Sequence, residues 1–381
     1  MKIGILGSRG IPNAYGGFEQ FATYLSAALA KRGHEVFVYN SSLHPYRDTQ
    51  WQSVKIIRCR DWENKLGAAG QFIYDLNCIT DSRKRNFDIV LQLGYTSNSL
   101  WYWLWPKNSI NVINMDGLEW KRTQYSRLTR MFLKKAESWA AKHGDHLIAD
   151  SICIQEYLLH SYNKTSTYIP YGAEIFHGPN PAVLENYNLE PQQYDLIVAR
   201  MEPENNIETV IAGYLQSQQK VPLVIVGNVN NKFGKRWRKK YENEKIKFPG
   251  AIYNQTTLNN LRYFSRIYFH GHSAGGTNPS LLEAMACSCT IVAHNNNFNR
   301  SVLSDNAFYF SSAGEIKAIL NQYTQADKRM MEQNLEKIRT EYGWDNIIEK
   351  YENLFIYAIP QKKNVTEAAH PPSVNHFLAT K

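Results

Sequence analysis

The sequence has few cysteines and no long apolar segment. Its five cysteines are odd in number and lack the paired spacing of zinc sites, so we expect reduced thiols rather than a disulfide framework. Nor does the start resemble a signal peptide, because Lys2 is followed at once by the strand-like Ile3 to Leu6 and a glycine-rich turn. No apolar run approaches the roughly 20 residues that a membrane-spanning helix needs. We therefore expect a cytoplasmic protein.

Several catalytic signatures are also missing. There is no Asp-x-Asp pair, and histidines and cysteines do not cluster at metal-ligand spacing, so we expect no metal dependence. Without a Gly-x-Ser-x-Gly elbow, a serine-hydrolase triad cannot be inferred. The second predicted strand ends Val38-Tyr39-Asn40 and lacks the acid that binds a ribose in nicotinamide enzymes, which disfavours a dehydrogenase.

The length and the net charge of the chain indicate the number of domains and the kinds of partner. A length of 381 residues predicts two cores of ordinary size, and a formal charge of +9 suits acidic ligands, an anionic membrane face or nucleic acid. Arg83 to Arg85 and Lys235 to Lys240 are basic runs that could contact nucleic acid or lipid, although such runs are more often solvated helix faces. The aromatic run Leu100 to Trp105 is either buried core, which we favour, or a membrane-interface segment.

Short β-rich runs alternate with helical patterns in both halves of the chain, which predicts βαβ units and parallel sheets. Strands are expected at 3–6, 36–39, 89–93, 110–114 and 147–149, and again at 196–198, 223–226, 267–269 and 291–293. The fold class is therefore α/β, with two doubly wound, Rossmann-like domains facing a central cleft. Ligands of such sheets bind beyond the carboxyl ends of the strands.

The domain boundaries follow from composition. A Gly- and Pro-rich stretch at 171–181 marks a linker, so we expect a first domain over residues 1–172 and a second over 173–340. A C-terminal helix over 341–359 is expected to pack back on the first domain. Residues 360–381 turn polar and are expected to form a disordered tail.

The stretch from Gly275 to Ala286 is the most informative motif. Gly275 and Gly276 allow close approach of a ligand to the backbone, Asn278 is a good N-cap, and Pro279 suits the first helical position. The helix N-terminus favours a pyrophosphate, and Glu283, about one turn later, could accept hydrogen bonds from ribose hydroxyls. The alternative is an ordinary capped helix with a solvated glutamate.

Two other turns follow predicted strands. Gly7-Ser-Arg-Gly10 with Gly16-Gly17 forms either a loop that shapes a sugar or acceptor pocket, which we favour, or a merely flexible turn. Arg200 closes the strand at 196–199, where it could bind a phosphate bidentately or form a surface ion pair with Glu202 or Glu204.

Longer motifs resemble those of a known family. Gly16-Gly17-Phe18-Glu19, Arg32 to Val36, Ala149-Asp150-Ser151, Ile169 to Ala173, Arg200 and Ser280 to Met285 are similar to the retaining GT-B glycosyltransferases that use nucleotide sugars. The segments at 7–19 and 114–122 resemble bacterial rhamnosyltransferases of capsule and exopolysaccharide assembly. This resemblance covers the chain from Met1 to about Ile359.

The sequence departs from the family pattern at three positions. Gly275 stands where relatives usually have a glutamate, so a sugar-ring contact would come from backbone N–H groups or from His272 and Asn278. Asn205 replaces the lysine that usually follows the phosphate-binding arginine, which leaves Arg9 as a substitute cation. Asp116 replaces a catalytic-region histidine, so the role of that residue does not transfer.

The resemblance implies a retaining, metal-independent transfer of a sugar, L-rhamnose first among the candidates, from a dTDP- or UDP-linked donor to a lipid-linked saccharide. The alternatives are a galactosyl-, fucosyl- or glucosyltransferase, a non-catalytic nucleotide-sugar binder, or a basic nucleic-acid protein. We expect no cofactor, no nucleic-acid partner and a peripheral location at an anionic membrane surface, reached through Arg83 to Arg85 and Lys121-Arg122.

The resemblance also implies roles for individual residues. The catalytic candidates are Asp116 and Arg200. The donor-binding candidates are Gly16, Gly17, Arg200, Asn205, His272, Gly275, Gly276, Thr277, Asn278, Ser280, Leu281 and Glu283. The acceptor-binding candidates are Arg9, Tyr15, Glu119 and Tyr171.

Overall fold

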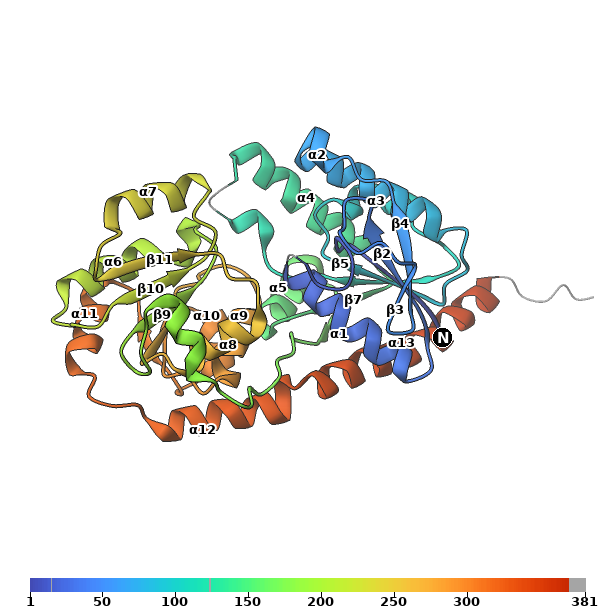
Figure 1. Ribbon diagram of the computed structural model, residues 1–381. Helices are drawn as coiled ribbons and strands as arrows, with labels where there is room; N and C mark the ends of the chain where they lie inside the picture. Colours follow the sequence, from blue (N-terminus) through green and yellow to red (C-terminus); the bar gives the residue numbers. More distant parts are fainter. Residues whose placement is uncertain (15, 123–124, 370–381) are drawn as a thin grey trace, which may run out of the picture.

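Two sheets organise the chain, one in each domain, with helices on both faces (Figure 1). The computed structural model describes residues 1–14, 16–122 and 125–369, with side chains described as far as residue 360. The first sheet has the order β3-β4-β2-β1-β5-β6-β7-β8 and is parallel except for β3. The second has the order β11-β10-β9-β12-β13-β14 and is parallel throughout. The expected α/β architecture of two doubly wound domains is confirmed.

The strands of the first sheet are β1 (Lys2–Leu6), β2 (Glu35–Ser41), β3 (Gln50–Trp51), β4 (Val54–Cys59), β5 (Ile89–Leu93), β6 (Ile110–Asn114), β7 (His146–Ala149) and β8 (Thr167–Tyr168). Those of the second are β9 (Asp195–Val198), β10 (Leu223–Val226), β11 (Ile246–Gly250), β12 (Ile267–His270), β13 (Ile291–His294) and β14 (Phe308–Phe310).

The α-helices are α1 (Gly17–Lys31), α2 (Glu63–Leu66), α3 (Ala68–Ser82), α4 (Arg127–His143), α5 (Ile152–Tyr162), α6 (Ile207–Gln216), α7 (Lys232–Tyr241), α8 (Gln255–Tyr263), α9 (Pro279–Ala286), α10 (Asn297–Leu303), α11 (Ala313–Gln322), α12 (Lys328–Lys337) and α13 (Trp344–Ala369). Short 3-10 helices are η1 (Asn98–Leu104), η2 (Glu119–Lys121), η3 (Pro181–Tyr187) and η4 (Pro203–Asn205), and η5 (Ile338–Tyr342) is a π-helical turn.

The central strands show why parallel sheets form. Every residue of β5, β6 and β10 is buried, as expected for strands covered by helices on both faces. The sequence therefore located these strands well. It missed β3, β4, β8, β11 and β14, which are edge or near-edge strands, short or interrupted by charged residues.

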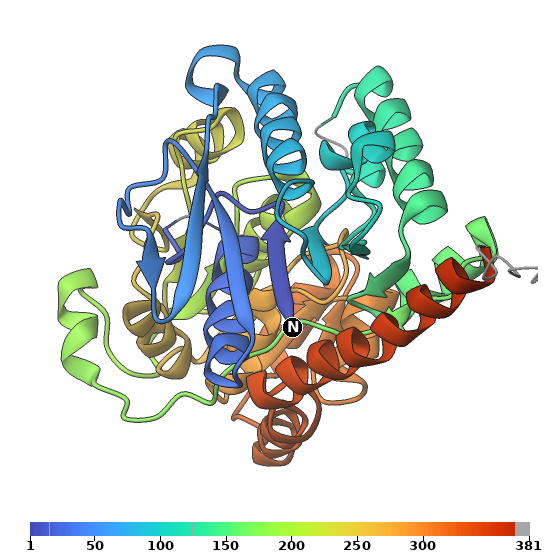
Figure 2. The same cartoon turned by 90° about the vertical axis from the view of Figure 1, so that its right-hand side faces the viewer.

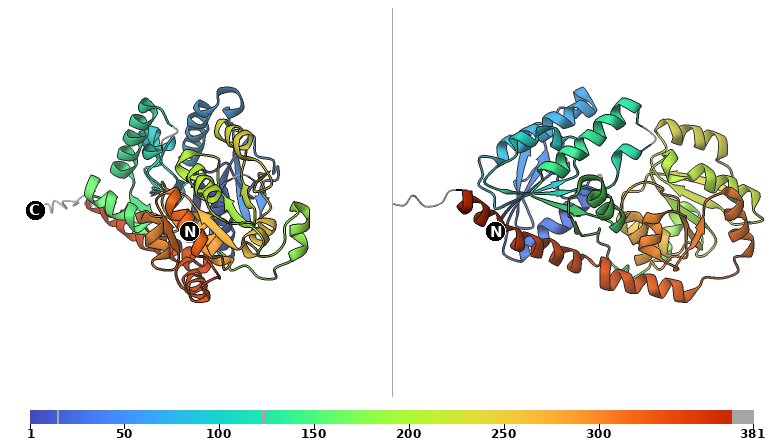
Figure 3. Two further views of the ribbon diagram at one scale, coloured as in Figure 1. Left: turned by 90° about the vertical axis from the view of Figure 1, so that its left-hand side faces the viewer. Right: turned by 180° about the vertical axis from the view of Figure 1, so that it is seen from behind.

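Two chain segments connect the domains and bind each other. The backbone N–H of Ala173 donates to the carbonyl of Tyr342 at 2.8 Å, so the outgoing and returning segments pair. Beyond this crossing, α13 packs on α1, with the Trp344 ring stacked on Tyr24 at 4.6 Å between centroids. The right-hand view of Figure 3 shows α12 and α13 running along one side of both domains, and Figure 2 shows α13 lying along the first domain.

The prediction of a disordered tail over residues 360–381 is wrong for its first ten residues. Helix α13 continues through Pro360 to Ala369. The glutamine, lysines, glutamate and alanines of this segment are good helix formers, and they sustain the helix despite their polarity. Residues 370–381 lie outside the described residues.

The aromatic run forms η1 and is mostly covered. Trp105 is buried, and the Trp101 indole donates to the carbonyl of Phe72 at 2.9 Å. Only Trp103 of this run is largely exposed, at 53%. Among the described helices, none combines the length and apolar character needed to cross a bilayer.

Candidate functional site

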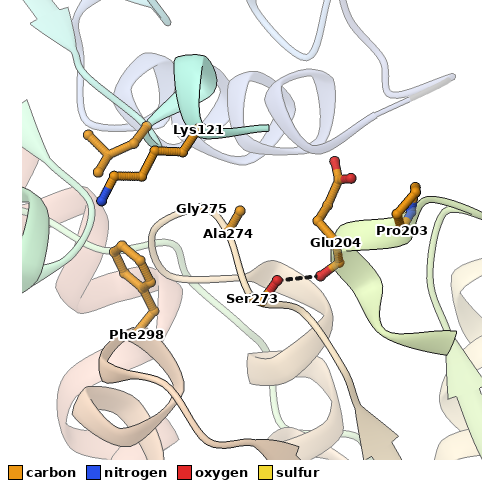
Figure 4. Close-up of a pocket in the computed structure, with 8 residues that line it drawn as sticks. Lys121, Pro203, Glu204, Ser273, Ala274, Gly275 and Phe298 are labelled. Carbon is orange, nitrogen blue, oxygen red and sulfur yellow. Dashed lines mark hydrogen bonds between the residues drawn. The ribbon is translucent and has the colours of Figure 1, made fainter. Parts of the chain in front are cut away.

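A cavity of 420 Å³ lies between the two domains (Figure 4). It is lined by Leu118 and Lys121 of the first domain and by Pro203, Glu204, Ser273, Ala274, Gly275 and Phe298 of the second. Most of these residues lie on segments that follow the carboxyl ends of the parallel strands β6, β9 and β12. The cleft therefore lies where doubly wound sheets bind their ligands.

The N-terminus of α9 borders this cleft with the expected geometry. The Asn278 side chain accepts a hydrogen bond from the Ser280 N–H at 2.9 Å, and Pro279 is the first helical residue. Across the domain boundary, α1 begins at Gly17, and a Cβ atom at Gly17 would lie 4.0 Å from Pro279 Cγ. Two helix N-termini, one from each domain, therefore meet here and make the position favourable for an anion.

The turn before α9 presents unused backbone donors. Among the described residues, none accepts a hydrogen bond from the N–H groups of Gly275, Gly276 or Asn278. Gly275 has φ of +121°, and a Cβ atom there would meet nothing within 4 Å. Successive free N–H groups in such a turn suit phosphate oxygens.

Gly276 and Thr277, both expected to bind the donor, contact Asp150 of the first domain. The Thr277 N–H donates to Asp150 Oδ2 at 3.1 Å, and the Thr277 hydroxyl donates to the Asp150 carbonyl. A Cβ atom at Gly276 would lie 1.9 Å from Asp150 Oδ1, so only glycine allows this contact. Burial first, and then Asp116, raise the pKa of Asp150 well above its usual range. Asp150 is thus a domain contact to which the sequence motif assigned no role.

Gly117 completes the contact between the domains. A Cβ atom at this position would lie 2.7 Å from the Cα of Gly275. The loop after β6 and the turn before α9 therefore touch through two glycines, and any side chain at residue 117 would separate them.

Glu283 is held by partners from both domains. Arg262 Nη2 lies 2.6 Å from Glu283 Oε2, and Gln20 Nε2 of α1 donates to Oε1 at 3.3 Å. The Arg262 side chain is only 1% exposed and that of Glu283 16%, so the alternative of a solvated glutamate is wrong. The carboxylate is held in a fixed orientation at the edge of the cleft.

Ser280 and Leu281, both expected to bind the donor, have hydrogen-bond partners within the second domain. The Ser280 hydroxyl lies 2.7 Å from the Tyr268 hydroxyl and accepts from Arg262 at 3.2 Å. Leu281 is buried, and its N–H donates to the carbonyl of Asn278 at 3.0 Å. Both residues shape the start of α9 rather than offer free groups to the cleft.

Arg200 is an exposed cation at the end of β9. Within the described part of the chain, the Arg200 guanidinium takes part in no ion pair, so the alternative of a surface pair with Glu202 or Glu204 is not observed. The positive charge of Arg200 nevertheless acts on Asp116 and His272. It shifts the pKa of each downward, in the case of Asp116 against the larger upward effect of burial. Arg200 therefore faces the same space as those residues and remains available to an anion.

Asn205 has a structural contact in place of the expected donor contact. It is buried, and its side-chain amide donates to the Arg200 carbonyl at 2.7 Å. This bond closes the turn after β9 and orients Arg200. An amide is too short to take the place of the lysine side chain that is usual in relatives.

His272 is neutral at physiological pH. Burial, with Arg200 and Arg122 nearby, lowers the pKa of His272 to about 3. Its ring stacks on His270 with 4.4 Å between centroids, and its Nδ1 has no partner among the described groups. A neutral ring with a free nitrogen can exchange hydrogen bonds with a sugar hydroxyl but cannot supply positive charge.

Asp116 lies directly before the contact between Gly117 and Gly275. Its φ of +42° is held by a hydrogen bond from its N–H to Asn114 Oδ1 at 3.0 Å. Burial raises the pKa of Asp116 to about 6, assisted by Glu119 and opposed by Arg122 and Arg200. A carboxyl group of this kind changes charge close to neutral pH.

A charged chain crosses the cleft from Glu119 to Glu204. Arg122 Nη2 lies 2.7 Å from Glu119, and Arg122 Nη1 lies 3.9 Å from Glu204 Oε1. The Arg122 side chain is only 16% exposed, so the expected surface cluster of Lys121 and Arg122 is wrong for Arg122. Arg122 points into the protein because two carboxylates attract it there.

Glu204 is the cleft residue that the sequence analysis missed as a site candidate. It is 8% exposed, and neither carboxylate oxygen has a hydrogen-bond partner among the described groups. Its carbonyl accepts hydrogen bonds from the N–H and hydroxyl of Ser273, which tie it to the turn before Gly275 (Figure 4). The only signal in the sequence was its position in the turn after a strand.

Of the predicted acceptor residues, Glu119 belongs to the charged chain at the cleft, whereas Arg9 and Tyr171 are held by other residues of the first domain. The Arg9 guanidinium is bound by Glu63 of α2 and lies 3.8 Å from Asp61, so it is not the free substitute cation that was expected. Tyr171 is buried, with its ring edge against Phe21 at 5.7 Å. Tyr15 lies outside the described residues.

Glu19 explains how the glycine-rich loop is held. It accepts a hydrogen bond from the Arg9 N–H at 2.6 Å, and Gly16 is the N-cap of α1. A Cβ atom at Gly16 would lie 2.7 Å from Glu19 Oε2. The loop is therefore packed against the first turn of α1, unlike a merely flexible turn.

Within the described ranges, no three His, Cys, Asp or Glu side chains are grouped so that they could hold a metal ion.

Comparison with known proteins agrees with this architecture. Residues 1–174 match a domain of unknown function, DUF1972, and residues 185–337 match the group 1 glycosyl transferases. An uncharacterized glycosyltransferase of Methanocaldococcus jannaschii is 21% identical over 376 residues, which cover 89% of this chain and 94% of the relative.

Solved structures share the whole arrangement of domains. Sucrose-phosphate synthase from Thermosynechococcus elongatus is similar with a TM-score of 0.75 at 16% identity, covering 94% of this chain and 99% of the other. HepE of Anabaena, in complex with UDP and glucose, has a TM-score of 0.72 at 15% identity, covering 94% and 100%. The chain thus shares the two-domain GT-B fold of these structures, and its second domain, residues 185–337, matches the group 1 glycosyl transferases.

Proposed function

We propose that this enzyme transfers L-rhamnose, with retention of configuration and without a metal ion, from a dTDP- or UDP-linked donor to a lipid-linked saccharide in surface polysaccharide assembly. The observation that carries the donor class is the pair of facing helix N-termini with free N–H groups at Gly275, Gly276 and Asn278. Such a position suits a diphosphate. The choice of rhamnose rests on the resemblance of the segments at 7–19 and 114–122.

In this proposal the enzyme acts mainly by stabilising the departing diphosphate. Arg200 and the N-terminus of α9 supply positive charge at the leaving group, and Glu283 binds the ribose hydroxyls in place of Gln20. The departing phosphate oxygen keeps the electron pair of the broken glycosidic bond and takes the proton of the acceptor hydroxyl, whose oxygen forms the new bond on the same face of the sugar. Asp116 orients the acceptor hydroxyl or the donor ring, and the ionised form is the one that accepts a hydrogen bond.

Glu204 is proposed as the carboxylate that meets the sugar ring. Relatives usually supply a carboxylate at the position of Gly275, and Glu204 borders the same cavity with two oxygens free of hydrogen bonds. A hydroxyl-bearing ring that enters the cavity would find acceptors there. HepE, which binds UDP and glucose, shares the fold, so UDP-linked sugars belong in the same test as dTDP-linked ones.

Thermal stabilisation by donors tests this function. We expect dTDP- or UDP-rhamnose to raise the melting temperature in buffer containing EDTA, because a ligand at about 100 times its Kd stabilises the folded state by about 2.7 kcal/mol. Release of free nucleotide diphosphate should occur only when acceptor is added. A different sugar as the stabilising donor would favour a galactosyl-, fucosyl- or glucosyltransferase, and binding without release would favour a non-catalytic binder. Activity lost in EDTA and restored by Mg²⁺ would contradict the metal-independent mechanism.

A pH profile tests the role of Asp116. Because its pKa is raised to about 6, its ionised fraction falls as pH drops through that value. We expect kcat/KM to fall about tenfold per pH unit below about pH 6. Asp116→Asn, which tolerates the same positive φ, should lower the rate and remove this acid limb. An unchanged acid limb in the variant would assign the titration to another group.

A further inference from the structure

The start of α4 carries two highly exposed apolar side chains next to a concentration of basic ones. Leu128 is 78% exposed and Met131 62% exposed. Arg127, Arg130 and Lys135 are exposed around them. The helix contains one acidic residue, Glu137, which is buried. The outer face of α4 is therefore positively charged along its whole length, with an apolar patch at its first turns.

The inner side of α4 is rigidly fixed. The buried Glu137 carboxylate accepts hydrogen bonds from the hydroxyls of Tyr157 at 2.5 Å and Tyr162 at 2.6 Å, and from the Trp120 indole at 2.9 Å. Lys134 lies 3.0 Å from the same carboxylate, so its charge is balanced within the fold. The net positive charge offered to the outside thus comes from Arg127, Arg130 and Lys135, and from Lys142 at the other end of the helix.

A groove of 780 Å³ runs beside this helix. It is lined by Arg127, Arg130, Lys134, Lys135, Met131 and Ser138 of α4 together with Trp120 and Tyr162. Arg130 Nε donates to the carbonyl of Trp120 at 2.9 Å, which joins α4 to η2. Lys121 of η2 lines the cavity between the domains. In Figure 1 the beginning of α4 points toward the second domain.

We propose that this face of α4 docks the enzyme on an anionic lipid bilayer. Exposed leucine and methionine side chains suit shallow burial at a bilayer surface, and the surrounding arginines and lysine suit lipid phosphates. The inference rests on the proposed lipid-linked acceptor, because docking through α4 brings the cavity entrance at Lys121 close to the headgroups. It replaces the contacts expected from the sequence.

Other basic clusters do not combine the two features. Arg85 is paired with Asp81 on α3, and the Arg122 side chain is turned inward. On α7, Arg236 and Lys240 are paired with Glu208. No large apolar side chain of α7 is exposed among the described residues. The face of α7 is therefore a control with similar charge and without the apolar patch.

Vesicle sedimentation of the full-length chain tests the proposal. We expect wild type to sediment with vesicles that mix phosphatidylglycerol and phosphatidylcholine, to remain in solution with pure phosphatidylcholine, and to be released by high salt.

Each basic residue near an anionic surface raises affinity roughly fivefold, so Arg127→Gln/Lys135→Gln should weaken binding roughly 25-fold. The matched variant Lys235→Gln/Lys239→Gln on α7 removes the same charge and should change binding less than twofold. Leu128→Ser/Met131→Ser should weaken binding while leaving the melting temperature unchanged.

Three outcomes would overturn the docking surface: no sedimentation of wild type at low salt, equal loss in the α4 and α7 variants, or displacement from vesicles by an oligonucleotide that binds α4 more tightly. Transfer to a detergent-solubilised lipid-linked acceptor, measured in the same variants, separates this proposal from the proposed function. If that transfer persists while vesicle binding is absent, the docking surface is wrong and the glycosyl transfer stands. If donors neither bind nor react, the proposed function itself is wrong.

Discussion

Replacing Arg200 by alanine is expected to lower kcat by about 100-fold or more while leaving the fold intact. The guanidinium is exposed and has no ion-pair partner among the described residues, so its removal leaves no buried charge behind. In the proposed mechanism its charge is most useful as the diphosphate departs, and losing one such stabilising group typically costs about 3 kcal/mol in the transition state. The expected signature is a large loss in kcat with an unchanged melting temperature.

The control for Arg200 is another exposed cation of the second domain that does not line the cavity between the domains. Lys239→Ala on α7 removes a positive charge from the same domain and should leave kcat unchanged. Arg200→Lys should restore part of the rate, because a lysine keeps the charge but loses the bidentate geometry. Wild-type kcat in Arg200→Ala would show that the arginine is an ordinary surface residue.

Local patterns predicted the elements and the start of α9, because those features depend on neighbouring residues. Buried β-branched runs define β5, β6 and β10, and an Asn-Pro pair sets the cap and first turn of α9. Edge strands such as β14 were missed because three residues carry no clear alternation. The fold class and the course of the central strands were thus available from the sequence.

Contacts between residues far apart in the sequence could not be predicted from such local patterns. The bond from Thr277 to Asp150 spans 127 positions, and nothing beside Thr277 marks it as a domain contact rather than a ligand contact. Arg9 looked free because its partner Glu63 lies in a separate helix. Arg122 looked exposed because Glu204, which attracts it inward, belongs to the other domain. In these three cases at least one partner is far away along the chain.

These contacts also hold the two domains together around the cleft. Asp150 and Thr277, Gly117 and Gly275, and Gln20 and Glu283 each join the first domain to the turn or helix that carries the candidate phosphate site. Parts of both domains therefore have fixed positions around that site. Because Glu283 contacts both Gln20 and the buried Arg262, we expect this one side chain to affect both the stability of the fold and the binding of the donor.

Replacing Glu283 by alanine is therefore expected to have two separable effects. Removing the carboxylate leaves the guanidinium of Arg262, only 1% exposed, without its ion-pair partner. Breaking a buried pair in this way typically costs about 3 to 5 kcal/mol of stability, so a lower melting temperature is expected even without donor. Loss of a charged hydrogen bond to the ribose should also weaken donor binding by about 2 kcal/mol.

Glu283→Gln separates these effects. Its amide oxygen can still accept a hydrogen bond from Arg262, so the melting temperature should fall less than in Glu283→Ala, while the ribose loses a charged acceptor. We expect donor Kd, measured by titration calorimetry at a temperature where both variants are folded, to rise at least tenfold in Glu283→Gln. Gln20→Ala is the matched control: it removes the other partner of the carboxylate, so donor affinity should be kept or improved as the ribose takes its place. If Glu283→Gln binds donor as tightly as wild type, the glutamate serves only the ion pair with Arg262, and the ribose is bound elsewhere.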